Sequence, residues 1–146
     1  MRSGVALEGK KQLLAKFVGL EGAMDRPEVE NACLRAAQII RNRTHGNIRR
    51  NFNRKTGRLF RSVIARKFKR RRKGDPGAMV AIDRKIAPHA HLLELGHFSR
   101  GRFVGPKPFF RPAVDSSRGA AWQQITKGIK GALKAETRRI LLKRTF

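Results

Sequence analysis

The chain has 146 residues, of which 35 are Lys or Arg and 10 are Asp or Glu, so its formal net charge is +25 at pH 7. This length predicts a single domain, residues 1–146, with a modest hydrophobic core. Self-repulsion at such a charge opposes compaction, which predicts contact with nucleic acid, another acidic surface or neighbouring subunits. The lone cysteine, Cys33, excludes a disulfide framework and a cysteine-based metal site. No apolar run is long enough for a membrane span or a signal peptide, which predicts a protein kept in a reducing interior.

The first third of the chain predicts helices over residues 8–50. A short amphipathic helix is expected in the second half of residues 5–20, and Gly22 marks the break that follows it. Pro27 suits the first turn of a second helix, which runs to about Arg50. Its apolar stripe has 3.6-residue spacing and consists of Val29, Cys33, Ala36, Ile40 and Ile48. Acidic residues at its start and arginines at its end complement the helix dipole.

Residues 56–111 predict a sheet and its loops. Thr56-Gly57 is a turn or cap signal, and residues 63–68 alternate weakly in hydrophobicity, as a half-buried strand does. The segment "AMVAI" (78–82) predicts the returning strand, and "KGDPG" (73–77) is a strong turn between the two. These signals predict a hairpin with a highly basic tip.

The last third begins with "APHAHLLELGH" (87–97), which predicts a short helix ended by Gly96. Residues 98–111 predict an irregular loop or a loose hairpin, and a C-terminal helix follows over residues 112–144. Its stripe comprises Val114, Ala121, Trp122, Ile125, Ile129, Leu133 and Ile140, while Gly119, Gly128 and Gly131 count against one straight rod. The predicted fold class is therefore α+β, with a small antiparallel sheet packed against N-terminal, central and C-terminal helices.

A basic window lies between Asn31 and Gly74, which holds 16 Lys or Arg and no acidic residue. Acids are too few to pair with all of these cations, so contact with a phosphate polymer is favoured over a solvated loop. The predicted nucleic-acid contacts are Arg66, Lys67, Lys69, Arg70, Arg71, Arg72 and Lys73. Reading of a base sequence is not expected, since the zinc-finger, helix-turn-helix and RRM signatures are missing from the chain.

Histidines suggest a metal site, which the pattern does not favour. His89, His91 and His97 could join Glu94 as ligands, but their spacing matches no common zinc site. Surface and cap positions on a short helix are the favoured interpretation. The sequence therefore predicts no metal and no cofactor.

A second faint pattern is Asp75, Asp83 and Lys85, which resembles the acid-acid-lysine layout of magnesium-dependent nucleases. Two carboxylates among so many cations are better explained as local counterions. The prediction is that the chain is not an enzyme, and a metal-dependent nuclease remains a distant alternative.

The stretch "KPFFRPAVD" (107–115) combines two prolines with two adjacent aromatic rings. The prolines limit the backbone freedom lost on docking, which favours an assembly surface. One ring would anchor the core of the domain and the other would face a neighbour. Glu94, in the same chain or across an interface, is a candidate partner for the Arg111 side chain. The competing interpretation, that both rings are core, stays open.

Three blocks in chain order carry a family resemblance. "TGRLFRSV" (56–63) resembles a TG-x-L-x-x-S-[IV] motif, "APHAHLLELGH" (87–97) a Tyr-Ala-x-x-x-Glu-Phe-Gly-Thr motif, and "KPFFRPAVD" (107–115) a Pro-Phe-[Leu/Phe]-Arg-Pro-Ala motif. Together they resemble the neck or tail-completion family of tailed bacteriophages. The positions that the resemblance assigns to assembly and to the family motif are Thr56, Gly57, Leu59, Ser62, Glu94, Gly96, Pro108, Phe109, Phe110, Arg111 and Pro112. The chain departs from the family pattern at His89, Leu95 and His97.

The resemblance implies a non-enzymatic virion protein that forms a ring, expected to be a hexamer, at the junction of head and tail. Its implied partners are further copies of itself, the head-tail connector or stopper proteins, and the tail terminator or tail tube proteins. It would assemble in the host cytoplasm, and its basic tip would hold the end of packaged double-stranded DNA without reading sequence. The open alternative is a basic RNA-binding structural protein of ribosomal-protein type, which shares the size and charge.

Overall fold

The computed structural model describes residues 22–23, 27–53, 56–68 and 76–142. In chain order its elements are α2 (Pro27–Asn51), α3 (Arg58–Ser62), β1 (Val63–Lys67), β2 (Ala78–Ile82), α4 (Ala90–Leu95), β3 (His97–Ser99), β4 (Arg102–Val104) and α5 (Arg111–Leu142). The predicted α+β class is confirmed, with two small antiparallel sheets of two strands each. The predicted helix within residues 5–20 and the basic residues 69–73 lie outside the described residues.

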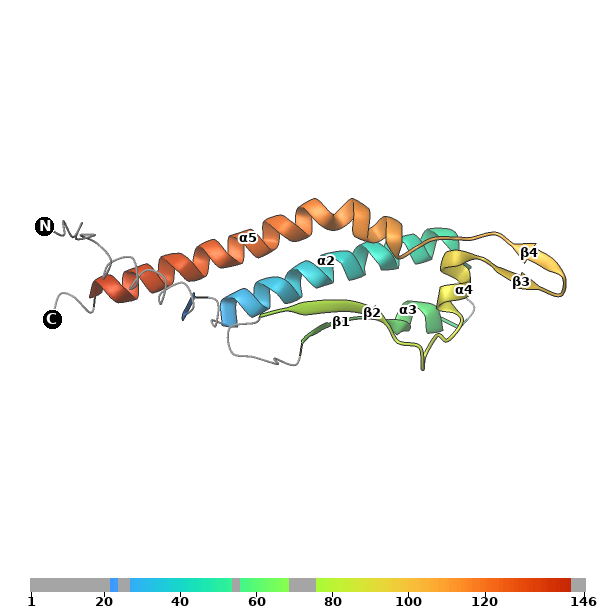
Figure 1. Ribbon diagram of the computed structural model, residues 1–146, viewed down its shortest axis with the longest axis horizontal. Helices are drawn as coiled ribbons and strands as arrows, with labels where there is room; N and C mark the ends of the chain where they lie inside the picture. Colours follow the sequence, from blue (N-terminus) through green and yellow to red (C-terminus); the bar gives the residue numbers. More distant parts are fainter. Residues whose placement is uncertain (1–21, 24–26, 54–55, 69–75, 143–146) are drawn as a thin grey trace, which may run out of the picture.

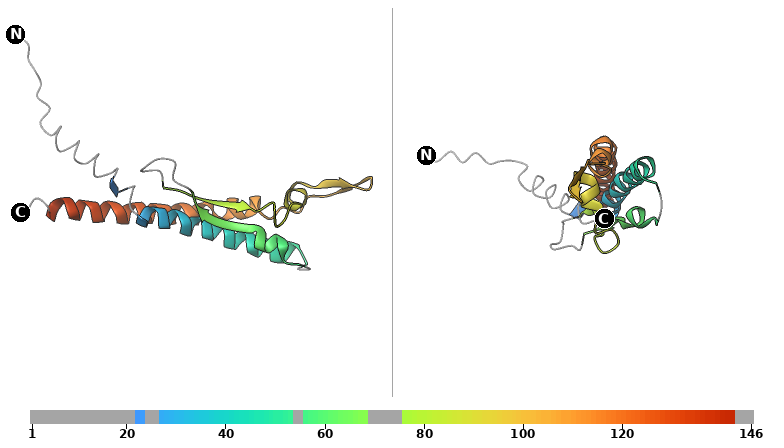
Figure 2. Two further views of the ribbon diagram at one scale, coloured as in Figure 1. Left: turned by 90° about the horizontal axis from the view of Figure 1, so that it is seen from below. Right: turned by 90° about the vertical axis from the view of Figure 1, so that its right-hand side faces the viewer.

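The helix α2 is the central layer of an elongated molecule. The long helix α5 packs against one side of α2 in the antiparallel direction, and the β1–β2 sheet covers the opposite side (Figures 1 and 2). The buried residues of α2 therefore spread over more than one stripe: Val29, Ala32, Ala36, Ala37, Thr44, Asn47 and Ile48. Of the predicted stripe, Val29, Ala36 and Ile48 are buried, while Cys33 and Ile40 are half-buried. None of the described helices has the length and apolar character that crossing a membrane requires.

The α2–α5 contact is built from small side chains. Gly128 of α5 faces the Ala32 side chain so closely that a Cβ at position 128 would overlap it. Beside this contact, Ala23, Val29 and Ala132 form a small buried cluster. The two helices can approach this closely because neither places a large side chain at the crossing.

The helix α5 differs from its sequence prediction in two respects. The three glycines were expected to interrupt it, yet it runs unbroken over 32 residues, because packing on α2 outweighs the weak propensity of single glycines. Trp122 was placed on the buried stripe, but its side chain is 69% exposed. Ala121, one position earlier, takes the buried place instead.

The two hairpins have different surroundings. The predicted hairpin of β1 and β2 is confirmed, with Val63 opposite Ile82 and Lys67 opposite Ala78, and it lies along α2. The β3–β4 hairpin, within the region predicted as a loop or loose hairpin, projects from the end of the molecule at which α2 ends and α5 begins (Figures 1 and 2). The short helix α3, which the sequence signals did not separate from the strand after it, links the end of α2 to β1.

Candidate functional site

The segment that leads into α5 is fixed by one carboxylate. Glu94 Oε2 accepts hydrogen bonds from the backbone N–H groups of Phe109 (2.8 Å) and Phe110 (3.0 Å), and Glu94 Oε1 accepts one from the N–H of Arg111 (2.9 Å). The first N–H groups of a helix have no partner within the helix, and they carry the positive end of its dipole. Glu94 satisfies both needs at the start of α5.

The carbonyl side of the same segment is held by α2. The Nδ2 atom of Asn47 donates to the Phe109 carbonyl at 3.0 Å, and the Nδ2 atom of Asn51 donates to the Pro108 carbonyl at 3.1 Å. The N–H of Lys107 donates to the Leu93 carbonyl at 2.8 Å. Side chains of α2 and the backbone and side chain of α4 thus fix the stretch "KPFFRPAVD" from two sides.

The structure bears on two expectations about this stretch, the partner of the Arg111 side chain and the burial of the two phenylalanine rings. Glu94 was a candidate partner for the guanidinium of Arg111, but its carboxylate instead binds three backbone N–H groups, and the Arg111 side chain is exposed. Phe109 is fully buried and makes an edge-to-face contact with Phe52 at a centroid distance of 5.8 Å. Phe110 is half-buried against the same core, so both rings serve the chain's own packing.

The three sequence blocks meet in that core. Leu59 comes from the first block, Ala90 and Leu93 from the second, and Phe109 and Phe110 from the third, and all five belong to one hydrophobic cluster. The cluster also contains Ile48, Phe52, Phe60, Val63, Val80, Ile82 and Ala87. Segments that lie far apart in the chain therefore support one another at the base of the projecting hairpin.

The polar and glycine positions of the blocks shape turns around the cluster. Gly57 has a φ of +68° immediately before α3, and Thr56 Oγ1 accepts the first N–H of that helix at 3.5 Å. The buried hydroxyl of Ser62 donates to a backbone carbonyl of α3 at 2.7 Å. Gly96 has a φ of +80°, and a Cβ there would lie 2.9 Å from the Val104 carbonyl oxygen. Pro108 and Pro112, which frame the aromatic pair, are exposed.

A histidine lies against this core. The His45 ring stacks on Phe60 at a centroid distance of 3.8 Å, and the guanidinium of Arg49 lies 5.2 Å from the centre of the same Phe60 ring. Burial lowers the pKa of His45 below its usual 6.5, and the positive charges of Arg41 and Arg49 lower it further. Its Nε2 atom is buried and has no hydrogen-bond partner among the described residues. The lowered pKa favours the neutral form of the ring, which packs against Phe60.

The β3–β4 hairpin carries Phe98, the most exposed large apolar side chain of the described residues. Phe98 is 78% exposed and Phe103 is 60% exposed, and their rings lie 5.2 Å apart across the two strands. Leu95 and Val104 extend the exposed apolar surface. We call these four residues the hairpin patch. An exposed cluster of this kind, on a hairpin that projects from the body, marks an interaction site.

The basic window is only partly described. Arg66 is exposed at the end of β1, as a phosphate contact requires. Lys67 differs, because its Nζ atom pairs with the Glu30 carboxylate of α2 at 3.2 Å. Lys69, Arg70, Arg71, Arg72 and Lys73 lie outside the described residues.

The candidate metal and nuclease residues have other partners. Glu94 is occupied by backbone N–H groups, while the His89 and His91 side chains are exposed. Asp83 Oδ1 accepts the N–H of Lys85 at 2.9 Å, which stabilises a turn. Asp75 lies outside the described residues, and no cluster of three metal-binding side chains occurs within them.

One group of surface residues was not identified from the sequence. It lies on the side of α5 that faces away from α2 and comprises Trp122, Gln123, Thr126, Lys127, Lys130, Gly131 and Lys134, which line one shallow groove. We call this set the α5 outer face. The exposure of Trp122 was not predicted, because a tryptophan on the apolar stripe of a helix is usually assigned to the core.

The chain matches no protein-family model, no curated protein and no solved structure. The likeness to phage neck proteins thus depends on the three sequence blocks alone. The geometry defines a small α+β protein with a rigid core at one end, a projecting apolar hairpin beyond it, and a basic helix face along its length.

Proposed function

We propose that this protein is a non-catalytic structural protein of the neck or tail top of a tailed bacteriophage, where its copies assemble into a ring. The observation that carries the proposal is the hairpin patch, with Phe98 78% and Phe103 60% exposed. A two-stranded hairpin is only marginally stable in water, and it gains stability when its apolar face is covered. Aromatic side chains also dominate the free energy of protein interfaces.

The shape of the subunit favours a head-to-tail contact. Because the hairpin lies at one end of an elongated molecule, it can reach the body of a neighbour. Contacts between unlike surfaces close into a ring when the rotation from one subunit to the next divides a full turn. The body offers two apolar pockets of suitable scale. One, of about 190 Å³, includes Ile48, Phe52, Leu59, Phe60 and Leu93, and the other, of about 340 Å³, includes Val80, Ile82, Ala87, Ala90 and Phe110.

The charge is consistent with a place beside packaged DNA. A ring multiplies the formal charge of +25 around its axis, and neighbouring phosphates relieve the resulting repulsion. Contacts from residues 66–73 to the DNA end would be independent of base sequence and steeply weakened by salt. Connector or stopper proteins on one side and tail terminator or tail tube proteins on the other are the proposed neighbours.

The test is electron microscopy of phage particles assembled with and without this protein. The proposal expects intact heads and tails that fail to join, or malformed tail tops, when the protein is missing. It also expects added purified protein to restore joining. Normal particles in its absence, together with a purified monomer that binds folded RNA, would contradict the proposal and favour the RNA-binding alternative.

A further inference from the structure

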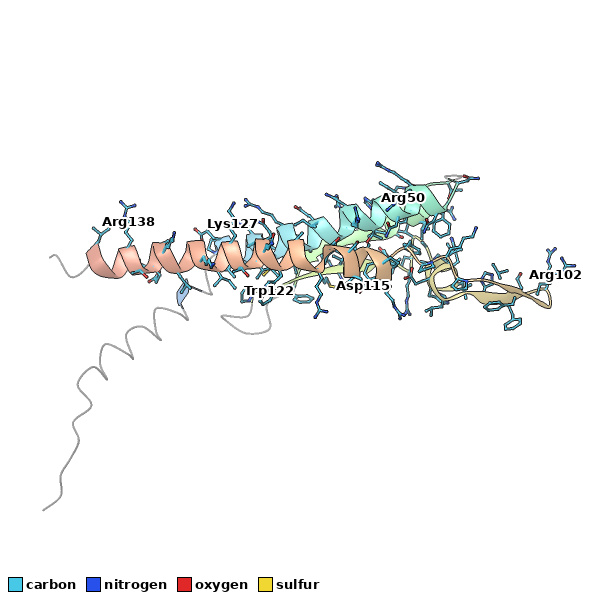
Figure 3. All side chains as sticks on the ribbon, turned by 90° about the horizontal axis from the view of Figure 1, so that it is seen from above. Arg50, Arg102, Asp115, Trp122, Lys127 and Arg138 are labelled. Atoms are coloured by element: carbon cyan, nitrogen blue, oxygen red, sulfur yellow. The ribbon has the colours of Figure 1, made fainter. Side chains whose placement is uncertain are left out.

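The α5 outer face combines an exposed aromatic ring with a row of lysines. Trp122 is 69% exposed, and Lys127, Lys130 and Lys134, further along the helix, line the same shallow groove. In Figure 3, Trp122 and Lys127 project from opposite sides of the α5 ribbon. The seven residues that line the groove include no carboxylate.

The lysine row is unfavourable for the isolated helix. Lys127, Lys130 and Lys134 are separated by three and four residues, so they are neighbours on the helix surface. Like charges at these separations destabilise a helix by about 0.2–0.5 kcal/mol per pair. A bound anion removes this repulsion, so the arrangement favours a negatively charged ligand.

Gly131 supplies an independent observation. It lies within the same groove, and a Cβ added to it would have no atom within 4 Å, whereas a Cβ at Gly128 would overlap Ala32. Packing within the described chain therefore explains Gly128 but gives no reason for Gly131. Glycine is less favourable than alanine in a helix, and one of its uses is to let a ligand approach the backbone closely.

We propose that the α5 outer face binds a single nucleic-acid strand, with the three lysines on consecutive phosphates and an unstacked base on the indole of Trp122. From Lys127 to Lys134 the helix rises about 10 Å at 1.5 Å per residue. Three consecutive phosphates of one strand are two steps apart, about 7 Å along the axis at about 3.4 Å per step, and the flexible lysine side chains can reach inward to match this span. A basic groove combined with an aromatic ring is the usual means of holding single strands without reading their sequence.

Other occupants fit this face less well. A second copy of the same face would bring its lysines against like charges, which costs free energy. A membrane surface requires a broad apolar face, whereas Trp122 is the single large apolar side chain in the groove. A peptide of acidic residues alone satisfies the lysines but has no aromatic or guanidinium plane for the indole. The inference does not depend on the proposed ring, and it concerns residues of α5 rather than residues 66–73.

The chain contains a single tryptophan, so its emission reports directly on this site. The purified full chain is titrated with a 20-nucleotide oligothymidylate, a blunt 20-base-pair duplex and polyglutamate, while anisotropy of labelled ligands gives the extent of binding. At saturation we expect strong quenching of the Trp122 emission by the single strand and much weaker quenching by the other two ligands. Unchanged emission with saturating oligothymidylate, or equal quenching by all three ligands, overturns the proposal.

Variants with matched charge locate the contact. The triple variant Lys127→Gln, Lys130→Gln and Lys134→Gln should bind oligothymidylate at least about tenfold more weakly at 0.15 M salt, with a salt slope smaller by roughly 2, because each single-strand contact contributes about 0.7. The control variant Arg84→Gln, Lys85→Gln and Lys107→Gln removes the same charge from exposed positions elsewhere. An equal loss of affinity for oligothymidylate in both triple variants would show that net charge alone causes the effect, and would contradict a binding site on α5.

Gly131→Ala separates binding from folding. The substitution should leave the melting temperature unchanged or raised, because alanine favours the helix, while the affinity for oligothymidylate falls several-fold. Unchanged affinity would contradict the close approach of the strand. Because these measurements use isolated protein, they can fail without affecting the particle-assembly experiment, and the reverse also holds.

Discussion

At the scale of single residues, Glu94 has the largest structural role in the candidate site. Its carboxylate joins α4 to three consecutive backbone N–H groups at the start of α5, at distances of 2.8–3.0 Å. Hydrogen bonds to a charged acceptor contribute more than neutral ones. Glu94 thus sets the angle between the long helix and the short helix that carries the hairpin.

Glu94→Gln should therefore destabilise the protein by about 2 kcal/mol, since hydrogen bonds to charged groups contribute about 1.5–3 kcal/mol each and the amide turns an NH₂ group toward a backbone donor. Urea unfolding followed by circular dichroism measures the change. Asp115→Asn is the matched control, because Asp115 is exposed on α5, and its effect should stay within about 0.5 kcal/mol. Equal stability of the two variants would show that the three hydrogen bonds contribute little.

The lowered pKa of His45 makes the free energy of unfolding depend on pH. Burial, with Arg41 and Arg49, lowers its pKa in the folded state below the 6.5 of the unfolded chain. At a pH between the folded-state and unfolded-state pKa of His45, the unfolded chain binds more protons than the folded one. The contribution of neutral His45 to the free energy of unfolding is therefore present above pH 6.5 and is lost progressively as the pH falls below 6.5. Urea midpoints measured from pH 8 to pH 5 should decline for the natural chain.

The His45→Phe variant should lose the part of this decline that begins near pH 6.5, because phenylalanine keeps the stacking on Phe60 and does not titrate. His91→Gln changes an exposed histidine and serves as the control, with the decline retained. A decline of the same size in His45→Phe would assign the pH dependence to other groups.

Sequence reasoning found the residues of the site more reliably than their partners. The block containing Glu94 and the block containing Phe109 and Arg111 were both identified. The bonds between them were not, because they join a side chain to backbone groups 15–17 residues away, and backbone groups leave no trace in the sequence. For this reason the pairing expected from charge, between Glu94 and the Arg111 side chain, is not formed within the chain, and a pairing across an interface stays a prediction.

At the scale of elements, long periodic helices were predicted best. The predicted helix from Pro27 to about Arg50 matches α2, because a proline in the first turn and a clear apolar period mark it locally. The outward position of Trp122 on α5 was missed, since α5 contacts α2 through alanine and glycine and its apolar period is weak. Local signals could not separate α3 from β1, because α3 has only 5 residues.

The glycines of α5 provide a test of helix packing. Gly128→Ala should destabilise the protein by about 1–3 kcal/mol, because the new methyl group overlaps Ala32 and α2 and α5 must separate. Gly119→Ala should instead stabilise it by about 0.5–1 kcal/mol, because nothing lies within 4 Å of the added Cβ and alanine favours the helix. Urea unfolding of both variants gives the two signs, and the same sign for both would refute the close α2–α5 contact.

At the scale of the whole molecule, folding and the proposed assembly use different surfaces. The core cluster fixes the end of the molecule from which the hairpin projects, while the hairpin patch stays exposed (Figure 1). The burial of Phe109 excludes it from direct contact with a neighbour, so in the proposed assembly the proline-framed stretch would act by positioning the hairpin. The large positive charge then acts along the sides of the molecule, where α5 and β1 present basic residues.

This separation predicts that assembly can be removed without unfolding the subunit. The double variant Phe98→Ser and Phe103→Ser should keep its unfolding free energy within about 0.5 kcal/mol, since both rings are largely exposed. The same variant should fail to form rings, because the hairpin patch, which is proposed to contact the neighbouring subunit, has lost its aromatic side chains. Light scattering after size-exclusion chromatography measures assembly, and urea unfolding measures stability.

The control Trp122→Ser with Leu142→Ser removes two other exposed apolar side chains and should still form rings. Rings that persist in the hairpin variant but vanish in the control would move the subunit contact from the hairpin to α5, and the nucleic-acid strand would then compete with assembly for the same helix face.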